Sequence, residues 1–344
     1  MNKDLTGGLN ESSEFVLAER PAVAETRDAV NVWIESADGE FGMRIGIEAV
    51  AEQWDSHDIW LDIAFADGRV ISFRESHKPV GTIDENGQST IRGAGPLTFQ
   101  CVTPFHLWTA AFNGDAPVTS ANNLAQGILL ENPPKVSVEF DIDMSMLVPP
   151  WVPGSLLADA EQALSGKQGE YMSPRYEQLF CAQGSLRVDG KDYVIAGNGL
   201  RIRRQGIRRL DGFWGHCWQS AVFPSGKAFG FNCYPPREDG ELSYNEGYVF
   251  DGSGELKAAR AVDVPWLDRL QANGDDVSFV IETEDGPVAV AGTTFINTRS
   301  IAKGSEVLPP NFPIVQQAHA RYSWGDEQAC GMVERSSTPD KITN

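Results

Sequence analysis

An arginine run near the middle of the chain concentrates charge in a way that could serve ligand binding. Five guanidinium groups fall within nine residues, with no acidic residue among them: Arg201, Arg203, Arg204, Arg208 and Arg209. One interpretation is a solvated strand edge paired with surface carboxylates. The other is that some of these side chains turn inward to hold a carboxylate, phosphate or enolate, for which the guanidinium fork is suited. In that case Arg204 is a catalytic candidate, and Arg201 and Arg208 are substrate-binding candidates.

A histidine and a tryptophan downstream share one face of a predicted strand. Residues two apart in a strand point the same way, so His216, Trp218 and Ser220 lie together. A histidine can exchange a proton with a bound substrate near neutral pH, and an indole face stabilises a developing carbocation. His216 is therefore the candidate for proton transfer, and Trp218 for the apolar wall. The alternative is a hydrogen-bonded core histidine.

Several further residues complete the candidate site. Glu177 is a catalytic candidate, because a carboxylate enclosed in a β-like run has a raised pKa or an arginine partner. A solvent-facing Glu177 is the alternative, since most glutamates are exposed. The remaining substrate-binding candidates are Trp214, Gln205, Trp60 and His57.

Other chemistries find little support in the sequence. The five histidines form no His-x-His or HExxH pattern, and the sequence has no GxSxG or P-loop motif. Gly197-x-Gly199 lacks the third glycine and the helix of a dinucleotide site. We therefore expect no metal and no cofactor, and a site that works by shape, desolvation and proton transfer.

Composition sets the broad class of the protein. The 344 residues, of which 41% are hydrophobic, predict about two domains with a core each. A net charge of -20 disfavours nucleic acid and anionic membrane surfaces as partners. No segment resembles a secretory signal or approaches the roughly 20 apolar residues of a membrane span. We expect a soluble, cytoplasmic monomer or homodimer that binds a hydrophobic small molecule, with or without an anionic or polar group.

Hydrophobic periodicity indicates an all-β fold. Apolar and polar residues alternate in runs such as 30–36, 58–65, 136–144, 185–195 and 277–283. Asp-Gly, Asn-Gly and Ser-Gly dipeptides between such runs favour tight hairpins, which predicts antiparallel pairing. Only Ser155 to Gly166 is convincingly helical, and it lies where a connection is needed.

An internal repeat predicts two similar units. Trp60, Phe65, Gly68 and Phe73 recur 158 residues later as Trp218, Phe223, Gly226 and Phe231. Gly42–Ile45 (GMRI) likewise returns as Gly199–Ile202 (GLRI). An antiparallel unit of this size most easily removes its sheet edges by closing into a barrel.

Specific motifs in the second half resemble a known family. They are Glu177-Gln178, the Val188–Gly190 hairpin, the GxGxR of Gly197–Arg201 and the GHxW of Gly215–Trp218. Together with the closing segment Ala329–Ser336, they resemble the AttH-like and carotenoid 1,2-hydratase (CrtC)-like family over about residues 30–336. The resemblance implies two tandem lipocalin-type barrels. It also implies water addition to alkenes, hydratase chemistry on isoflavonoids, or pericyclic ring closure.

One departure from the family pattern bears on function. After GxGxR the family usually continues Asp-His-Ser-Trp-Gly-x-Arg, where this chain reads Ile202-Arg203-Arg204-Gln205-Gly206-Ile207-Arg208. The acid and base groups of that motif are therefore replaced by cations.

The sequence thus predicts an all-β protein with two tandem lipocalin-like antiparallel barrels and short connecting helices. The expected division is a flexible tail over 1–27, a barrel over 28–150, a helical linker over 151–172, a barrel over 173–336 and a tail over 337–344. The first hypothesis for function is a cofactor-independent lyase or isomerase, most plausibly a hydratase or dehydratase, acting on a terpenoid, steroid-like or polyketide molecule. The alternatives are a non-catalytic protein that binds such a ligand, and a cyclase or pericyclase that folds its substrate.

Overall fold

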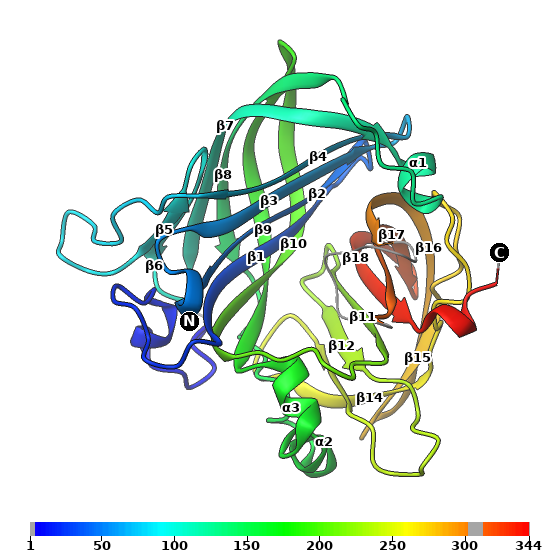
Figure 1. Ribbon diagram of the computed structural model, residues 1–344. Helices are drawn as coiled ribbons and strands as arrows, with labels where there is room; N and C mark the ends of the chain where they lie inside the picture. Colours follow the sequence, from blue (N-terminus) through cyan, green and yellow to red (C-terminus); the bar gives the residue numbers. More distant parts are fainter. Residues whose placement is uncertain (1–3, 302–311, 344) are drawn as a thin grey trace.

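The computed structural model describes residues 4–301 and 312–343 and shows an all-β protein built from two barrels side by side (Figure 1). Among the described residues, the first sheet has the strand order β4-β3-β2-β1-β10-β9-β8-β7-β6-β5, and β4 also pairs with β7. This last pairing closes β1–β4 and β7–β10 into a ring. The β5–β6 hairpin lies outside this ring and pairs with β7 through β6. The strand bounds are β1 (Thr26–Ser36), β2 (Phe41–Val50), β3 (His57–Phe65), β4 (Arg69–His77), β5 (Ile91–Ala94), β6 (Leu97–Thr103), β7 (Leu107–Ser120), β8 (Lys135–Met146), β9 (Arg175–Val188) and β10 (Lys191–Ile207).

The second barrel is smaller and closes in simple up-and-down order from β11 to β18. Its interior is packed with aromatic and small side chains, among them Phe229, Phe231 and Phe279. The strand bounds are β11 (Gly215–Val222), β12 (Ala228–Cys233), β13 (Asn245–Phe250), β14 (Lys257–Asp263), β15 (Phe279–Thr283), β16 (Gly286–Ile301), β17 (Ile314–Trp324) and β18 (Glu327–Ser337).

Short helices lie in the connections between strands. The predicted helical linker forms as α2 (Ala158–Leu164) and α3 (Lys167–Met172), which lie beneath the junction of the barrels in Figure 1. The side chain of Glu246 in β13 binds this linker, because its oxygens accept hydrogen bonds from Trp151 Nε1 and from the backbone of residues 154, 156 and 157. The remaining helices are η1 (Glu11–Glu14), η2 (Ala51–Gln53), α1 (Ala121–Ala125) and η3 (Pro339–Lys341). Within the described ranges, no helix is long and apolar enough to cross a membrane.

The division between the barrels differs from the one that the sequence predicts. The sequence assigns residues 173–336 to the second barrel, whereas β9 and β10 belong to the first sheet. The reason is the pairing of β10 with the whole of β1, from Thr26 opposite Ile207 to Ser36 opposite Gly197. Linker helices therefore precede the last two strands of the first barrel, and the second barrel begins at β11.

The repeated hairpin is present in both barrels with the same register. Trp60 pairs with Arg74 in β3–β4, and Trp218 pairs with Asn232 in β11–β12, so the partner is 14 residues away in each case. Phe73 and Phe231 point into their barrels. The GMRI and GLRI segments, however, lie in β2 and β10 of the same barrel. The superposition of the two complete barrels stays a prediction.

The N-terminal segment is not a free tail. Its chain enters the first barrel, where Leu5, Glu14 and Val16 are buried. Glu14 accepts a hydrogen bond from Arg201 at 2.7 Å, and a buried carboxylate with such a partner holds the segment in place. The expected flexible tail over 1–27 is therefore wrong for the described residues from 4 onward. Near the other end, Thr343 donates to the backbone oxygen of Asp268.

Candidate functional site

A cavity of about 320 Å³ lies between the two barrels. Strands β1, β2, β9 and β10 of the first barrel form one wall, which contributes Asn31, Trp33, Arg44, Glu48, Arg175, Ile202 and Arg204. Strands β11, β12, β17 and β18 of the second barrel form the other, which contributes His216, Trp218, Asn232, Val315, Gln317 and Glu334. The interiors of both barrels are filled with side chains, so the candidate site uses their outer faces.

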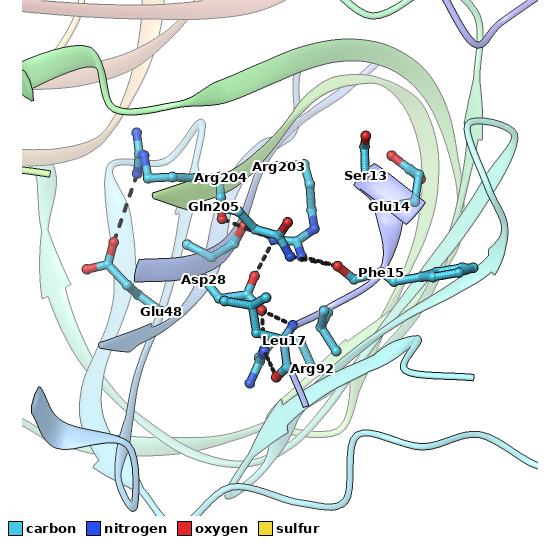
Figure 2. Close-up of polar contacts among 12 residues, drawn as sticks. Ser13, Glu14, Phe15, Leu17, Asp28, Glu48, Arg92, Arg203, Arg204 and Gln205 are labelled. Carbon is cyan, nitrogen blue, oxygen red and sulfur yellow. Dashed lines mark hydrogen bonds and ion pairs between the residues drawn. The ribbon is translucent and has the colours of Figure 1, made fainter. Parts of the chain in front are cut away.

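Strand alternation decides which arginines of the run reach this cavity. Successive side chains of β10 point to opposite faces, so Arg201 and Arg203 enter the first barrel while Ile202 and Arg204 face outward. Figure 2 shows Arg203 beside Asp28 and Phe15, while Arg204 points away from them toward Glu48. Arg208, which follows the end of β10, also lines the cavity and donates from Nε to the backbone oxygen of Tyr171 at 3.3 Å.

Arg204 is a buried cation with little compensating charge. It is 4% exposed, and its nearest carboxylate in the described chain is Glu48, at 4.0 Å. Glu48 is itself held by Arg27 at 2.5 Å. Burial first, and then the charges of Arg208 and Arg175, lower the pKa of Arg204 well below its ordinary value. The wall around Arg204 is therefore electropositive.

Several buried polar atoms at this cavity lack a protein partner. Within residues 4–301 and 312–343, no hydrogen bond is made by Nδ2 of Asn31, Nε1 of Trp33, Nε of Arg175 or Nε of Arg204. Oδ1 of Asn232, on the opposite wall, is in the same situation among the described residues. Buried polar groups are normally paired, so unpaired ones that line a cavity suggest a bound partner.

Aromatic rings surround the charged groups. Trp33 packs edge-on against Trp218, with ring centroids 4.9 Å apart. The guanidinium of Arg44 lies 5.4 Å from the Trp33 ring and 5.1 Å from the Trp60 ring. Other lining aromatics are Tyr171, Phe213, Tyr234 and Phe312. The cavity therefore offers apolar faces as well as cations.

His216 lines the cavity as the sequence predicts, but both of its ring nitrogens already have contacts. Nδ1 is 2.6 Å from Oγ of Ser336, and Nε2 is 3.0 Å from Oε1 of Glu334. The second oxygen of Glu334 accepts from Gln317. Burial would raise the pKa of Glu334, but the hydrogen bond and charge of His216 hold it at about 2, so this carboxyl is ionised. Proton exchange between His216 and a ligand thus requires one of these contacts to open.

Glu177 lies outside the cavity lining and supports it from behind. Its oxygens accept from Arg175 at 2.5 Å and from Nε1 of Trp218 at 2.9 Å. Burial raises the pKa of Glu177, against the opposing effect of Arg175. Glu177 therefore positions two lining side chains.

The other predicted site residues lie elsewhere. Arg201 is fully buried inside the first barrel with Glu14, and Gln205 donates to the backbone oxygen of Phe15. His57 is buried in the first barrel, where desolvation and then the charge of Arg92 lower its pKa to about 4.

The other two tryptophans predicted in the site, Trp214 and Trp60, lie beside the cavity without lining it. Trp214 donates to the backbone oxygen of Pro235 and packs against Tyr171 and Tyr234. Trp60 covers Gly46, where an added Cβ would lie 2.2 Å from the indole ring. The absence of a side chain at Gly46 therefore lets Trp60 lie close to the strand, next to Arg44.

Sequence reasoning missed most of the polar groups of the cavity. Alternation along 30–36 and 41–50 would have placed Asn31 with Trp33 and Arg44 with Glu48, but nothing local says that these faces meet a second barrel. Asn232 lies opposite Trp218 in the β11–β12 hairpin, whereas Glu334 comes from the distant strand β18, and only the tertiary pairing brings it to His216. Among the described residues, no group of three His, Cys, Asp or Glu side chains lies close enough to hold a metal ion.

Solved structures of similar fold match nearly the whole chain. A protein described as AttH, from Nitrosomonas europaea, has a TM-score of 0.55 at 14% identity, covering 92% of this chain and 93% of that one. CghA has a TM-score of 0.56 at 10% identity, covering 97% and 96%. Kievitone hydratase from Nectria haematococca has a TM-score of 0.53 at 10% identity, covering 98% and 96%. These likenesses show that the chain shares the lipocalin-like fold of these proteins.

No curated protein matches the sequence. The model of a family described as a domain of unknown function, DUF7064, matches residues 22–339, and the chain therefore belongs to that family.

Proposed function

We propose that the cavity between the barrels binds a hydrophobic small molecule with an anionic oxygen group, and that the protein converts it as a cofactor-independent lyase or isomerase of the hydratase or dehydratase type. The observation that carries this proposal is Arg204, a buried guanidinium at the cavity wall with an unpaired Nε and one distant carboxylate in the described chain. A cation in this state is stabilised by a ligand anion, which supplies the missing charge and hydrogen bond.

The surrounding groups support the same class of ligand. Asn31 and Trp33 present further buried donors without partners in the described residues, and a ligand oxygen can accept from them. Trp218, Phe213 and Tyr234 offer ring faces to an apolar body. A ligand that combines an oxygen anion with a hydrophobic skeleton satisfies both parts of the cavity.

Proton transfer is the step that hydration or dehydration requires. In hydration, an acid delivers a proton to one alkene carbon while a base takes one from the attacking water. His216 and Glu334 are the titratable pair on the second-barrel wall, where a proton could be exchanged once their contact opens. The neighbour named kievitone hydratase has a name that denotes water addition, and CghA has been solved with Sch210972. These names favour small-molecule chemistry in the same fold.

A non-catalytic binding protein is the second candidate. It is favoured by the engagement of both His216 ring nitrogens, with Ser336 and with Glu334. It is also favoured by residues 202–205, where cations replace the acid and base groups of the AttH-like pattern that the sequence resembles. A cyclase that acts by folding its substrate would need only the shape of the cavity.

The anion site can be tested with two fluorescent probes of the same ring system. Anilinonaphthalene sulfonate carries an anion, whereas N-phenyl-1-naphthylamine lacks it. We expect Arg204→Met to weaken sulfonate binding by about tenfold or more and to leave amine binding unchanged, because only the charge-assisted contact is lost. Arg209→Met is the matched control, since Arg209 is exposed and binds Glu25 and Glu170 away from the cavity. Equal effects on both probes, or none, would contradict the anion site.

Catalysis is tested separately from binding. A ligand that copurifies with the protein can be identified by native mass spectrometry and then incubated with it in heavy-oxygen water. A hydratase incorporates the label into its product. A binding protein returns the ligand unchanged, and a cyclase changes its ring pattern without the label. A dehydratase gives a product lighter by one water. Incorporation of the label or loss of one water agrees with the proposed reaction, and the other outcomes contradict it.

A further inference from the structure

A chain of hydrogen bonds runs along the second-barrel wall and ends at the cavity. In the antiparallel pair β11–β18, His216 lies opposite Ser336, and Trp218 lies opposite Glu334. Glu334 and Ser336 are two residues apart in β18 and share a strand face, so the ring of His216 lies between their side chains and contacts both. Ser336 is fully buried, while the side chains of His216 and Glu334 are 9% and 15% exposed. The chain therefore begins in the core and ends at the carboxylate of Glu334.

The direction of each hydrogen bond follows from the groups involved. Oγ of Ser336 accepts from the backbone N–H of His216 at 3.0 Å and lies 2.6 Å from Nδ1, to which it donates its own hydrogen when the ring is neutral with its hydrogen on Nε2. A carboxylate can only accept, so Nε2 of His216 carries the hydrogen that bonds to Glu334. Gln317 donates to the other oxygen of Glu334. The bonds from His216 and Gln317 thus both end on the Glu334 carboxylate and fix its position, and Ser336 holds the His216 ring from the other side.

The unpaired polar atoms of the two walls differ in hydrogen-bonding character, although Glu48 also lies on the first-barrel wall. Arg204, Asn31 and Trp33 on the first-barrel wall are donors, and they suit a ligand anion. Glu334 on the second-barrel wall is an ionised acceptor, and it repels an anion but binds a hydroxyl. A carboxylate oxygen has about two lone-pair directions, so each oxygen of Glu334 can accept a further bond besides those from His216 and Gln317.

We infer that Glu334 is a fixed acceptor for a ligand hydroxyl, that Ser336 and His216 are positioning residues for it, and that the ligand is consequently a hydrophobic hydroxy acid. This inference rests on the proposed anion site, because the acid group is assigned to Arg204. It deepens that proposal by specifying the second polar group of the ligand and the wall that receives it. Hydroxy acids are also the class in which dehydration removes, and hydration creates, the group that Glu334 would hold.

Binding of simple naphthoates tests the ligand class. The probes are 2-naphthoate, 6-hydroxy-2-naphthoate and 7-hydroxy-2-naphthoate, measured by titration calorimetry. We expect the wild-type protein to bind at least one of the two hydroxylated acids about tenfold more tightly than 2-naphthoate, as one charge-assisted hydrogen bond predicts. Glu334→Met should abolish this preference while retaining 2-naphthoate binding. If that variant does not fold, Glu334→Gln should reduce the preference, because a neutral amide oxygen is the weaker acceptor.

The outcomes separate this inference from the proposed function. Arg204→Met should weaken all three acids alike, and a failure to do so contradicts the anion site itself. A wild-type protein without preference for either hydroxylated acid, or a preference that survives in both Glu334 variants, overturns the hydroxyl assignment alone. If no naphthoate binds to the wild-type protein, both proposals are wrong.

The positioning role of Ser336 has its own readout in the nitrogen-15 spectrum of the His216 ring. At a pH where the ring is neutral, we expect the Nε2–H tautomer in the wild-type protein, a mixture of tautomers in Ser336→Ala, and restoration in Ser336→Thr, which keeps the hydroxyl. His216→Gln assigns the signals. Ser220→Ala is the control, because Ser220 is a buried serine on the same face of β11 with no hydrogen-bond partner for Oγ in the described chain. An Nδ1–H tautomer in the wild type, or identical ring signals in Ser336→Ala, would refute the positioning role.

Discussion

Replacement by Met should affect protein stability differently at two arginines of β10. Arg201 lies inside the first barrel and donates to Glu14 at 2.7 Å and to Gln178 at 2.9 Å. Arg204 faces the cavity, and its nearest carboxylate in the described chain is 4.0 Å away. Replacement by Met keeps the apolar stem of each side chain and removes its guanidinium. The difference between Arg201→Met and Arg204→Met therefore separates a structural cation from a ligand-binding one.

The loss of unfolding free energy expected for Arg201→Met can be estimated from the ion pair that Glu14 would lose. Burial alone would raise the pKa of Glu14, but Arg201 and donors from Tyr176 and Trp108 bring it below its ordinary value. Removing one partner of a buried ion pair costs about 3 to 5 kcal/mol of unfolding free energy. Tyr176, Trp108 and the backbone N–H of Phe105 still serve Glu14, so we expect the lower end, about 3 kcal/mol.

Arg204→Met should leave stability nearly unchanged or raise it slightly. The substitution relieves the repulsion among Arg204, Arg208 and Arg175 and removes the cost of burying one cation. We expect a change within about 1 kcal/mol of wild type.

Urea unfolding followed by circular dichroism and by tryptophan fluorescence measures both variants, and coincident curves check two-state behaviour. The double variant Glu14→Gln with Arg201→Met should be more stable than the sum of the single effects predicts, because neither charge is then left alone. A loss of 3 kcal/mol in Arg204→Met, or less than 1 kcal/mol in Arg201→Met, would refute this assignment of the two arginines.

Three further predictions concern buried titratable groups. The pKa of Glu334 is about 2, below the ordinary 4.5, so its contribution to stability is present above pH 4.5 and lost as pH falls toward 2. Glu334→Gln should therefore be less stable than wild type by up to about 3 kcal/mol at neutral pH, with the difference closing over that interval in urea unfolding at a series of pH values. His57 has its pKa lowered from 6.5 to about 4, so the unfolded chain takes up its proton first, and stability falls as pH drops between these values. In His57→Leu the free energy of unfolding should no longer show this fall, which amounts to at most about 3 kcal/mol in the wild-type protein. The same fall in the variant and in the wild-type protein would contradict a buried neutral ring at His57. Glu246→Gln should lower the free energy of unfolding by about 1.5 to 3 kcal/mol, because its hydrogen bonds to Trp151 and the linker backbone are then made by a neutral amide. Wild-type stability of this variant in calorimetry would contradict the role of Glu246 in holding the linker.

Much of the first barrel and part of the site could be predicted from local patterns. Alternation along strands such as β8, where exposed and buried residues follow each other strictly, indicates a half-buried antiparallel sheet. Arg204, Arg208, His216 and Trp218 were predicted in the site, and all four line the cavity. They were found because a charge cluster and an alternating strand are features of neighbouring residues.

Arg201, Gln205 and His57 were misplaced for a related reason. A shift of one residue along a strand moves a side chain to the other face, and composition says nothing about which face meets the second barrel. The interior partners of these residues are Glu14, the backbone of Phe15 and the Asp28–Arg92 pair, which come from segments far away in the chain.

The sequence by itself determined the all-β class, the hairpins, the repeated Trp and Phe positions, and a cationic run in an acidic chain, because each depends on residues close together in the chain. Only the tertiary structure decided that β9 and β10 belong to the first barrel and that Glu334 contacts His216. It alone decided that the face of β10 that carries Arg204 lines the cavity, while the face that carries Arg201 lies inside the first barrel. Strand pairing joins residues more than a hundred positions apart, as His216 and Ser336 are, and the face each one presents depends on a register that no local pattern specifies.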